Sequence, residues 1–190
     1  MAGSTRSYEM ARRLVDAGHE VHMVTSNRNS NKNKNRQWYK TIESGIQVHW
    51  IQIPYSNNLS YNDRVKAFFK FAIKASTKAA SLVGDVVFAT STPLTIAIPG
   101  IFAAKLNRIP MVFEVRDLWP NLPIAMGAIK NSALIFAARQ LERFAYRYST
   151  RIVALSPGMK EGIVATGYPS ENATVPSITR KSLDEIMTHI

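Results

Sequence analysis

Short apolar runs and longer amphipathic stretches alternate along most of the chain, and this alternation predicts a regular succession of strands and helices. The segment MVFEV at 111–115 has the pattern of a buried strand, whereas the first helical stretch begins at a capping residue, Ser4 or Thr5. Pro99 and Gly100 predict a kink in the third helix. The predicted helices cover residues 4–17, 62–83, 94–106, 132–148 and 157–165. The predicted strands cover residues 20–25, 46–53, 85–89, 111–115, 151–155 and 172–175.

Mostly apolar strands that are separated by helices are typical of a parallel sheet covered on both faces. The predicted fold class is therefore α/β, with a Rossmann-like, doubly wound parallel sheet. Such a sheet starts with a central strand, but here Met1-Ala2-Gly3 leads directly into the first helix. We therefore expect that the first central strand is missing and that the chain is the product of an incomplete reading frame. The alternative is a fold that begins with a helix.

The composition limits the chemistry that the chain can perform. Its 190 residues suffice for one domain with its own core, and the absence of cysteine excludes disulfides, thiol chemistry and cysteine-bound metals. His19, His22, His49 and His189 lack metal-ligand spacing, so we expect no metal. Because no apolar run is long enough to span a bilayer and no signal-peptide pattern opens the chain, we expect a cytoplasmic location.

The charge balance points to an anionic partner. The chain has 24 lysines and arginines against 13 acidic residues, a net charge of +11. One basic region is the segment 27–40, with five basic residues, five asparagines and no acid. Two interpretations remain open for it: a loop that faces phosphates or lipid headgroups, or a solvated insertion.

The predicted helix 62–83 carries a second basic region. Lysines recur at every fourth position and form a stripe along the helix, at Lys66, Lys70, Lys74 and Lys78. The opposite side is expected to carry Val65, Phe68, Phe69, Ala72, Ile73 and Ala79. An anionic membrane would relieve the repulsion within the stripe, with roughly 1 kcal/mol gained per basic residue near the surface. A core-packed helix with a solvated lysine face is the alternative.

The absence of several known motifs argues against other classes of protein. Neither a helix-turn-helix, an RNP-type aromatic pair nor a zinc-ligand spacing is present, so we expect no nucleic-acid partner. The sequence also lacks the GxSxG, Walker and GxGxxG motifs of hydrolases, nucleotide triphosphatases and dehydrogenases.

Polar residues follow the apolar strand 111–115 without a turn, in the sequence Arg116-Asp117-Leu118-Trp119-Pro120. In a parallel sheet, ligands bind at the carboxyl ends of the strands. This rule places Arg116 and Asp117 at the mouth of the expected ligand crevice. An internal ion pair that closes the strand is the alternative. Ser156-Pro157-Gly158 also joins a predicted strand to a helix, which offers backbone amides to an anion.

Four blocks of the sequence resemble the N-terminal domain of family 4 glycosyltransferases, of the kind that build bacterial surface polysaccharides. The blocks are residues 2–26, 88–106, 112–120 and 152–175. The most specific block, VFEVRDLWP at 112–120, is similar to the fucosaminyl- and acetamidosugar-transferring branch.

The resemblance implies one half of a GT-B fold. Residues 3–175 would form the acceptor-side domain, residues 176–190 depart from the family as a divergent tail, and the C-terminal nucleotide-sugar domain is absent. The implied activity is retaining, metal-independent transfer of a sugar from a nucleotide-sugar to a lipid-linked or saccharide acceptor in O-antigen (lipopolysaccharide) or capsule synthesis. The chain alone is expected to be inactive, and its implied location is peripheral, at the inner face of the cell membrane.

The resemblance also implies roles for individual residues. Arg116 and Asp117 would be catalytic on the acceptor side of the cleft, and Gly3 would belong to the turn that approaches the donor phosphates. The other implied substrate-binding residues are Ser4, Arg6, Glu114, Trp119, Ser156 and Gly158. Two other hypotheses remain: a non-catalytic Rossmann-like module that binds an anionic membrane or a partner protein, and a nucleotide-sugar epimerase. The missing GxGxxG motif and Tyr-x-x-x-Lys pair argue against the epimerase.

Overall fold

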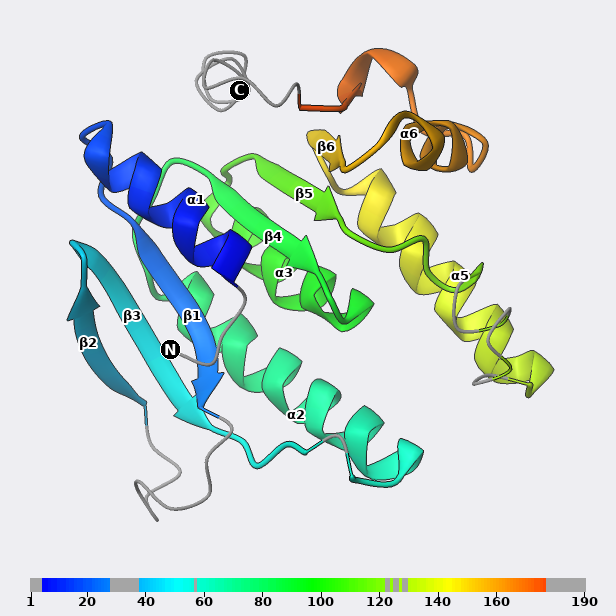
Figure 1. Ribbon diagram of the computed structural model, residues 1–190, viewed down its shortest axis with the longest axis horizontal. Helices are drawn as coiled ribbons and strands as arrows, with labels where there is room; N and C mark the ends of the chain where they lie inside the picture. The colour runs from blue at the N-terminus through cyan, green and yellow to red at the C-terminus, as the bar shows by residue number, and fades with distance from the viewer. Residues whose placement is uncertain are drawn as a thin grey trace. The chain divides into compact units, whose positions relative to one another are not determined.

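The computed structural model describes residues 5–27, 38–56, 58–121, 124, 127 and 130–176, with the backbone alone at Thr5 and Tyr61 (Figure 1). The chain divides into two compact units, residues 1–82 and 83–190. Gly3 and Ser4, residues 28–37 of the basic segment, and residues 177–190 of the tail lie outside the described part.

The first unit is a small three-stranded sheet with two helices (Figure 1). Its elements are α1 (Thr5–Asp16), β1 (His22–Asn27), β2 (Tyr39–Glu43), β3 (Ile46–Gln52) and α2 (Tyr61–Ala80). The strand order is β1-β3-β2; β1 runs parallel to β3, and β2 runs antiparallel to it. Buried Ala11 of α1 packs against Ile46 and Val48 of β3, which explains the apolar positions on these elements.

The second unit is a parallel sheet with the order β4-β5-β6-β7. Its elements are β4 (Val87–Ser91), η1 (Leu94–Ile96), α3 (Ala97–Asn107), β5 (Met111–Val115), α5 (Ser132–Arg147), β6 (Arg151–Ala154), α6 (Pro157–Val164), η2 (Ser170–Asn172) and β7 (Ala173–Thr174). All five residues of β5 are buried, because this strand lies between β4 and β6.

The core of the second unit forms where helices pack on one face of this sheet. Phe113 of β5 lies against Tyr146 of α5, with the ring centroids 6.4 Å apart. Gly100 allows α3 to approach the sheet closely, because a Cβ atom there would come within 2.9 Å of Ala89 and Met111. The apolar positions from which the helices and strands of this unit were predicted thus include the residues that are buried in its core.

The α/β class with Rossmann-like parallel strands is confirmed, although the strands form two hydrogen-bonded sheets. One strand was not predicted: β2 occupies residues that were expected to form a loop. Its apolar residue Ile42 is exposed, as is Lys40, so the segment lacks the apolar pattern of a strand that packs on a core. The predicted helix 94–106 is divided into the 3-10 helix η1 and α3, and Pro99 falls in the first turn of α3, where no backbone N–H is needed. Among the described helices, none is both long and apolar enough to cross a bilayer.

Candidate functional site

The carboxyl ends of β4 and β5 bring together two polar segments, Thr90-Ser91-Thr92 and Glu114 to Asp117. The register of these parallel strands pairs Thr90 with Glu114 and Ser91 with Val115. Residues about 25 positions apart in the sequence therefore lie side by side at one edge of the sheet.

Glu114 is a carboxylate inside this edge. Its side chain is 1% exposed, and Thr90 Oγ1 donates a hydrogen bond to its Oε2 atom at 2.8 Å. Its neighbours Phe113 and Val115 point into the apolar core, so the alternation of the strand directs Glu114 to the other face. A buried carboxylate is costly without such partners, so the hydrogen bond from Thr90 helps to stabilise Glu114 at the strand end.

Ser91 fixes the path of the chain as it leaves β5. The buried Ser91 Oγ accepts a hydrogen bond from the backbone N–H of Arg116 at 2.9 Å. Arg116 is half-buried, at the first position after the strand. The predicted placement of Arg116 at the carboxyl edge of the sheet thus agrees with the structure.

Asp117 lies beside the end of β4. Thr92 Oγ1 is 3.4 Å from Asp117 Oδ2 and also contacts the carbonyl oxygen of Ser91. The backbone N–H of Trp119 donates to the carbonyl oxygen of Asp117 at 3.1 Å, which turns the loop back on itself. A half-buried carboxylate with one weak hydroxyl partner can accept a further hydrogen bond from a ligand hydroxyl.

Apolar packing holds this loop in place. Leu118 and Trp119 pack against the core of the second unit, and the Thr92–Pro93 and Trp119–Pro120 peptide bonds are both cis. A Cβ atom at Gly162 of α6 would come within 2.8 Å of Leu118 Cδ1, so α6 lies directly against the loop. Trp119 therefore forms part of the packed wall of the site.

The segment after β6 provides a third polar strand end. Ser156 caps α6, because its Oγ atom accepts a hydrogen bond from the backbone N–H of Met159 at 3.3 Å. Gly158 is exposed in the first turn of this helix. The Ser156 hydroxyl thus has a capping role, whereas the backbone around Gly158 is open to solvent.

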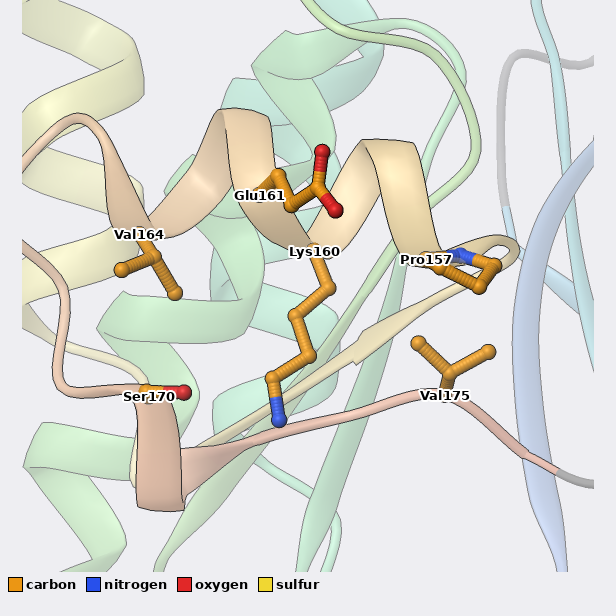
Figure 2. A pocket seen from close by; sticks show the side chains of 6 residues that line it. All are labelled: Pro157, Lys160, Glu161, Val164, Ser170 and Val175. Carbon is orange, nitrogen blue, oxygen red and sulfur yellow. The ribbon is translucent and has the colours of Figure 1, made fainter.

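A shallow cavity of about 300 Å³ lies beside this helix (Figure 2). It separates α6 from the segment that contains η2 and β7, and Lys160 extends across it from α6 (Figure 2). The lining residues are Pro157, Lys160, Glu161, Val164, Ser170 and Val175. Sequence reasoning identified the start of α6 but missed Lys160, since a lysine in a short helix carries no distinguishing signal.

The other predicted site residues lie in the first unit. Arg6 is exposed on α1. Lys66 and Lys70 are exposed on α2, whereas Lys74 and Lys78 are half-buried.

The predicted position of Phe69 and Ile73 on the buried side of α2 is wrong. These side chains are 44% and 67% exposed, and Ala72 and Ala75 form the buried face instead. Four residues advance a helix by about 400°, so a lysine stripe at this spacing drifts by about 40° per step. The stripe therefore begins beside Phe69 and Ile73 and winds toward the sheet at Lys78.

Two histidines form a polar pair inside the first unit. His22 Nδ1 and His49 Nε2 are 3.0 Å apart, and His22 Nε2 lies 3.2 Å from Glu20 Oε1. Burial, followed by the charges of Lys78, His22 and Lys40, lowers the pKa of His49 to about 4. Within the described ranges, no group of three or more histidines and acidic residues could hold a metal ion.

The chain was compared with solved structures and with curated proteins. It is similar to structures of Anabaena Alr3699/HepE in complex with UDP-glucose (TM-score 0.45, 14% identity), with UDP and glucose (0.42, 13%) and with UDP (0.41, 14%). The matches cover 77% of this chain but only 36–37% of those chains, so it spans little more than a third of their length. No curated protein matches the chain.

A family model gives a match over almost the whole chain. The model is described as "Glycosyl transferase 4-like domain", and it matches residues 2–177. This range includes the polar ends of β4, β5 and β6. The chain therefore belongs to the glycosyl transferase 4-like domain family.

Proposed function

We propose that the chain is the acceptor-side part of a glycosyltransferase that moves a sugar from a nucleotide-sugar to a lipid-linked or saccharide acceptor. The observation that carries this proposal is the cluster of Thr92, Arg116 and Asp117 at the carboxyl edge of β4 and β5, within the range matched by the family model. Family membership supplies the class of reaction, and the cluster supplies groups suited to it.

The proposed reaction uses these groups in a simple way. The acceptor oxygen forms a bond to the anomeric carbon, while the bond between that carbon and the nucleoside diphosphate breaks with its electron pair going to phosphate. Asp117 orients the acceptor hydroxyl and takes its proton, and Arg116 offers positive charge to a phosphate group. Transfer with retention of configuration is part of the proposal, as is the absence of a required metal.

The finer assignment rests on the block VFEVRDLWP, 112–120. Its similarity to the fucosaminyl- and acetamidosugar-transferring branch supports a role in O-antigen or capsule synthesis. Transfer is expected only from a longer protein that joins this chain to a nucleotide-sugar-binding domain. Gly3, Ser4, Arg6, Glu114, Trp119, Ser156 and Gly158 are proposed to contact or shape the substrate site.

The test is a transfer assay with such a joined protein, a panel of nucleotide-sugars and a polyprenyl-diphosphate-sugar acceptor. Asp117→Asn should lower kcat by a factor of about 100 or more, because it removes the proton acceptor. Asp85→Asn, at an exposed position before β4, is the matched control. Equal activity of the two variants would show that Asp117 has no role in the chemistry. Failure of every donor and acceptor with the unaltered protein would reject the proposed reaction.

A second proposal is that α2 binds an anionic membrane. It is supported by the exposed lysines Lys66 and Lys70, which lie on the same side of the helix as exposed Phe69 and Ile73. Charged and apolar side chains in one surface are typical of helices that lie in a lipid interface. Vesicle co-sedimentation of a Lys66→Glu/Lys70→Glu variant tests the idea, and undiminished binding to phosphatidylglycerol vesicles would contradict it.

A further inference from the structure

The outer side of α3 and α5, in the second unit, exposes an unusual share of large apolar residues. Five of the nine exposed large hydrophobic residues in the described part of the chain lie on these two helices. They are Phe102, Leu106, Leu134, Phe136 and Phe144. Phe136 and Leu106 are 65% and 64% exposed, although a monomeric surface usually scatters such residues singly.

The two helices meet near their C-terminal ends. Lys105 of α3 places its Nζ atom 3.5 Å from the centre of the Tyr148 ring, just after α5. Phe144 packs edge-on against the same ring, at a centroid distance of 4.6 Å. We give the name α3/α5 surface to eight of the exposed side chains on these helices: Phe102, Lys105, Leu106, Phe136, Arg139, Arg143, Phe144 and Arg147. Exposed Leu134 lies on another side of α5, about 160° around the helix axis from Phe136, and is not part of it.

The charge of this surface has one sign. Arg139, Arg143 and Arg147 recur at every fourth position of α5 and are exposed. The single acidic residue within the two helices, Glu142, is buried and accepts a hydrogen bond from Tyr146 at 3.2 Å. Neighbouring arginines repel one another, and an anionic partner would relieve that repulsion.

The positions of these residues on α5 decide the kind of partner. With 100° per residue, Phe136, Arg143 and Arg147 fall within about 40° of one another around the helix axis. The apolar side chain of Phe136 and the two guanidinium groups thus lie on the same exposed side of α5. We propose that the α3/α5 surface lies on an anionic phospholipid membrane, where the arginines bind headgroup phosphates and Phe136 and Leu106 enter the acyl boundary.

Other occupants fit less well. A second copy of this chain, paired symmetrically, would place the arginine row against itself. A nucleic acid would use the arginines but gain little from exposed Phe136 and Leu106 on a helix. The inference uses different residues from the proposed α2 contact and does not depend on sugar transfer.

The absence of cysteine in the chain allows a site-specific test. Phe136→Cys, labelled with an environment-sensitive fluorophore, should show a blue shift on vesicles that contain phosphatidylglycerol, and brominated lipid should quench it. The matched control is Arg13→Cys on α1, also exposed, whose label should keep its aqueous spectrum. A label at position 136 that stays aqueous on vesicle-bound protein would overturn the inference.

Binding measurements of unlabelled variants complete the test. Arg143→Gln/Arg147→Gln should weaken partitioning into phosphatidylglycerol vesicles about thirty-fold, and Phe136→Ala about tenfold. The control pair Arg13→Gln/Lys40→Gln removes the same charge from exposed positions and should bind as the unaltered chain does. The inference is wrong if only the Lys66→Glu/Lys70→Glu variant loses binding, because α2 alone would then make the contact. It is also wrong if Arg143→Gln/Arg147→Gln weakens binding to RNA as much as binding to vesicles, while Phe136→Ala leaves binding to vesicles unchanged.

Discussion

The backbone N–H of Arg116 donates a hydrogen bond to Ser91 Oγ at 2.9 Å, and this bond ties the start of one strand-end loop to the end of the neighbouring strand. Ser91 is the last residue of β4, and it is 1% exposed. The position of Arg116, and of Asp117 after it, thus depends on a hydroxyl group of another strand.

Removal of this hydroxyl should destabilise the second unit. Ser91→Ala removes a buried hydroxyl that accepts the hydrogen bond from the Arg116 N–H, which costs about 1–3 kcal/mol. The free energy of unfolding, from urea denaturation, measures the loss. Ser132→Ala, at the exposed first position of α5, should change it by less than about 0.5 kcal/mol. Equal effects of the two substitutions would show that the Ser91 bond contributes nothing specific.

Two glycines of α6 should respond to alanine in opposite directions. A Cβ atom at Gly162 would lie 2.8 Å from Leu118 Cδ1, whereas one at Gly158 has no atom within 4 Å. Gly158→Ala should gain up to about 1 kcal/mol of helix propensity, and Gly162→Ala should lose about 1–3 kcal/mol by displacing the Leu118 loop. Thermal unfolding of the two variants gives the comparison. A Gly162→Ala variant as stable as Gly158→Ala would mean that α6 does not hold this loop.

Sequence patterns located most elements because apolar positions in this chain follow burial closely. They missed β2, because the short segment Tyr39–Glu43 has no buried position: half-buried Tyr39, Thr41 and Glu43 alternate with exposed Lys40 and Ile42. They also put Phe69 and Ile73 on the wrong face of α2, since a four-residue spacing does not stay on one side of a helix.

The candidate site was predictable only in part. Arg116 and Asp117 stood out because polar residues end an apolar strand. Their partners Ser91 and Thr92 did not, because the register of β4 and β5, and not sequence proximity, brings them together. The signal that was available is the polar run Thr90-Ser91-Thr92 at the end of the preceding strand.

The turn between β2 and β3 offers a test of how α1 is attached to its sheet. Gly45 has a φ of +80°, and a Cβ atom there would lie 2.6 Å from Val15 Cγ1 of α1. Gly18 has a similar φ of +94° but no atom within 4 Å. Alanine should therefore cost strain at both positions, about 1 kcal/mol or more, and an additional 1–3 kcal/mol or so of overpacking at Gly45 alone. Urea denaturation of the two variants measures the difference. Equal losses in the free energy of unfolding would show that the Val15 side chain moves aside without a measurable energetic cost.

The His22–His49 pair should make the stability of the first unit depend on pH. His49 lies on β3, where burial and the charges of Lys78 on α2, His22 on β1 and Lys40 on β2 lower its pKa from 6.5 to about 4. Glu20 faces the other nitrogen of His22, at 3.2 Å. Between pH 4 and 6.5, the unfolded chain therefore binds more protons at His49 than the folded chain does.

The free energy of unfolding should consequently be highest above pH 6.5 and fall as the pH drops from 6.5 toward 4, with a slope of up to about 1.4 kcal/mol per pH unit from this one proton. His49→Gln should flatten this slope, because glutamine does not titrate, while its amide can still bond to His22. His19→Gln, which changes an exposed histidine, should leave the slope as it is. Urea denaturation at a series of pH values measures all three proteins. A slope that survives in His49→Gln would assign the pH dependence to other groups of the chain.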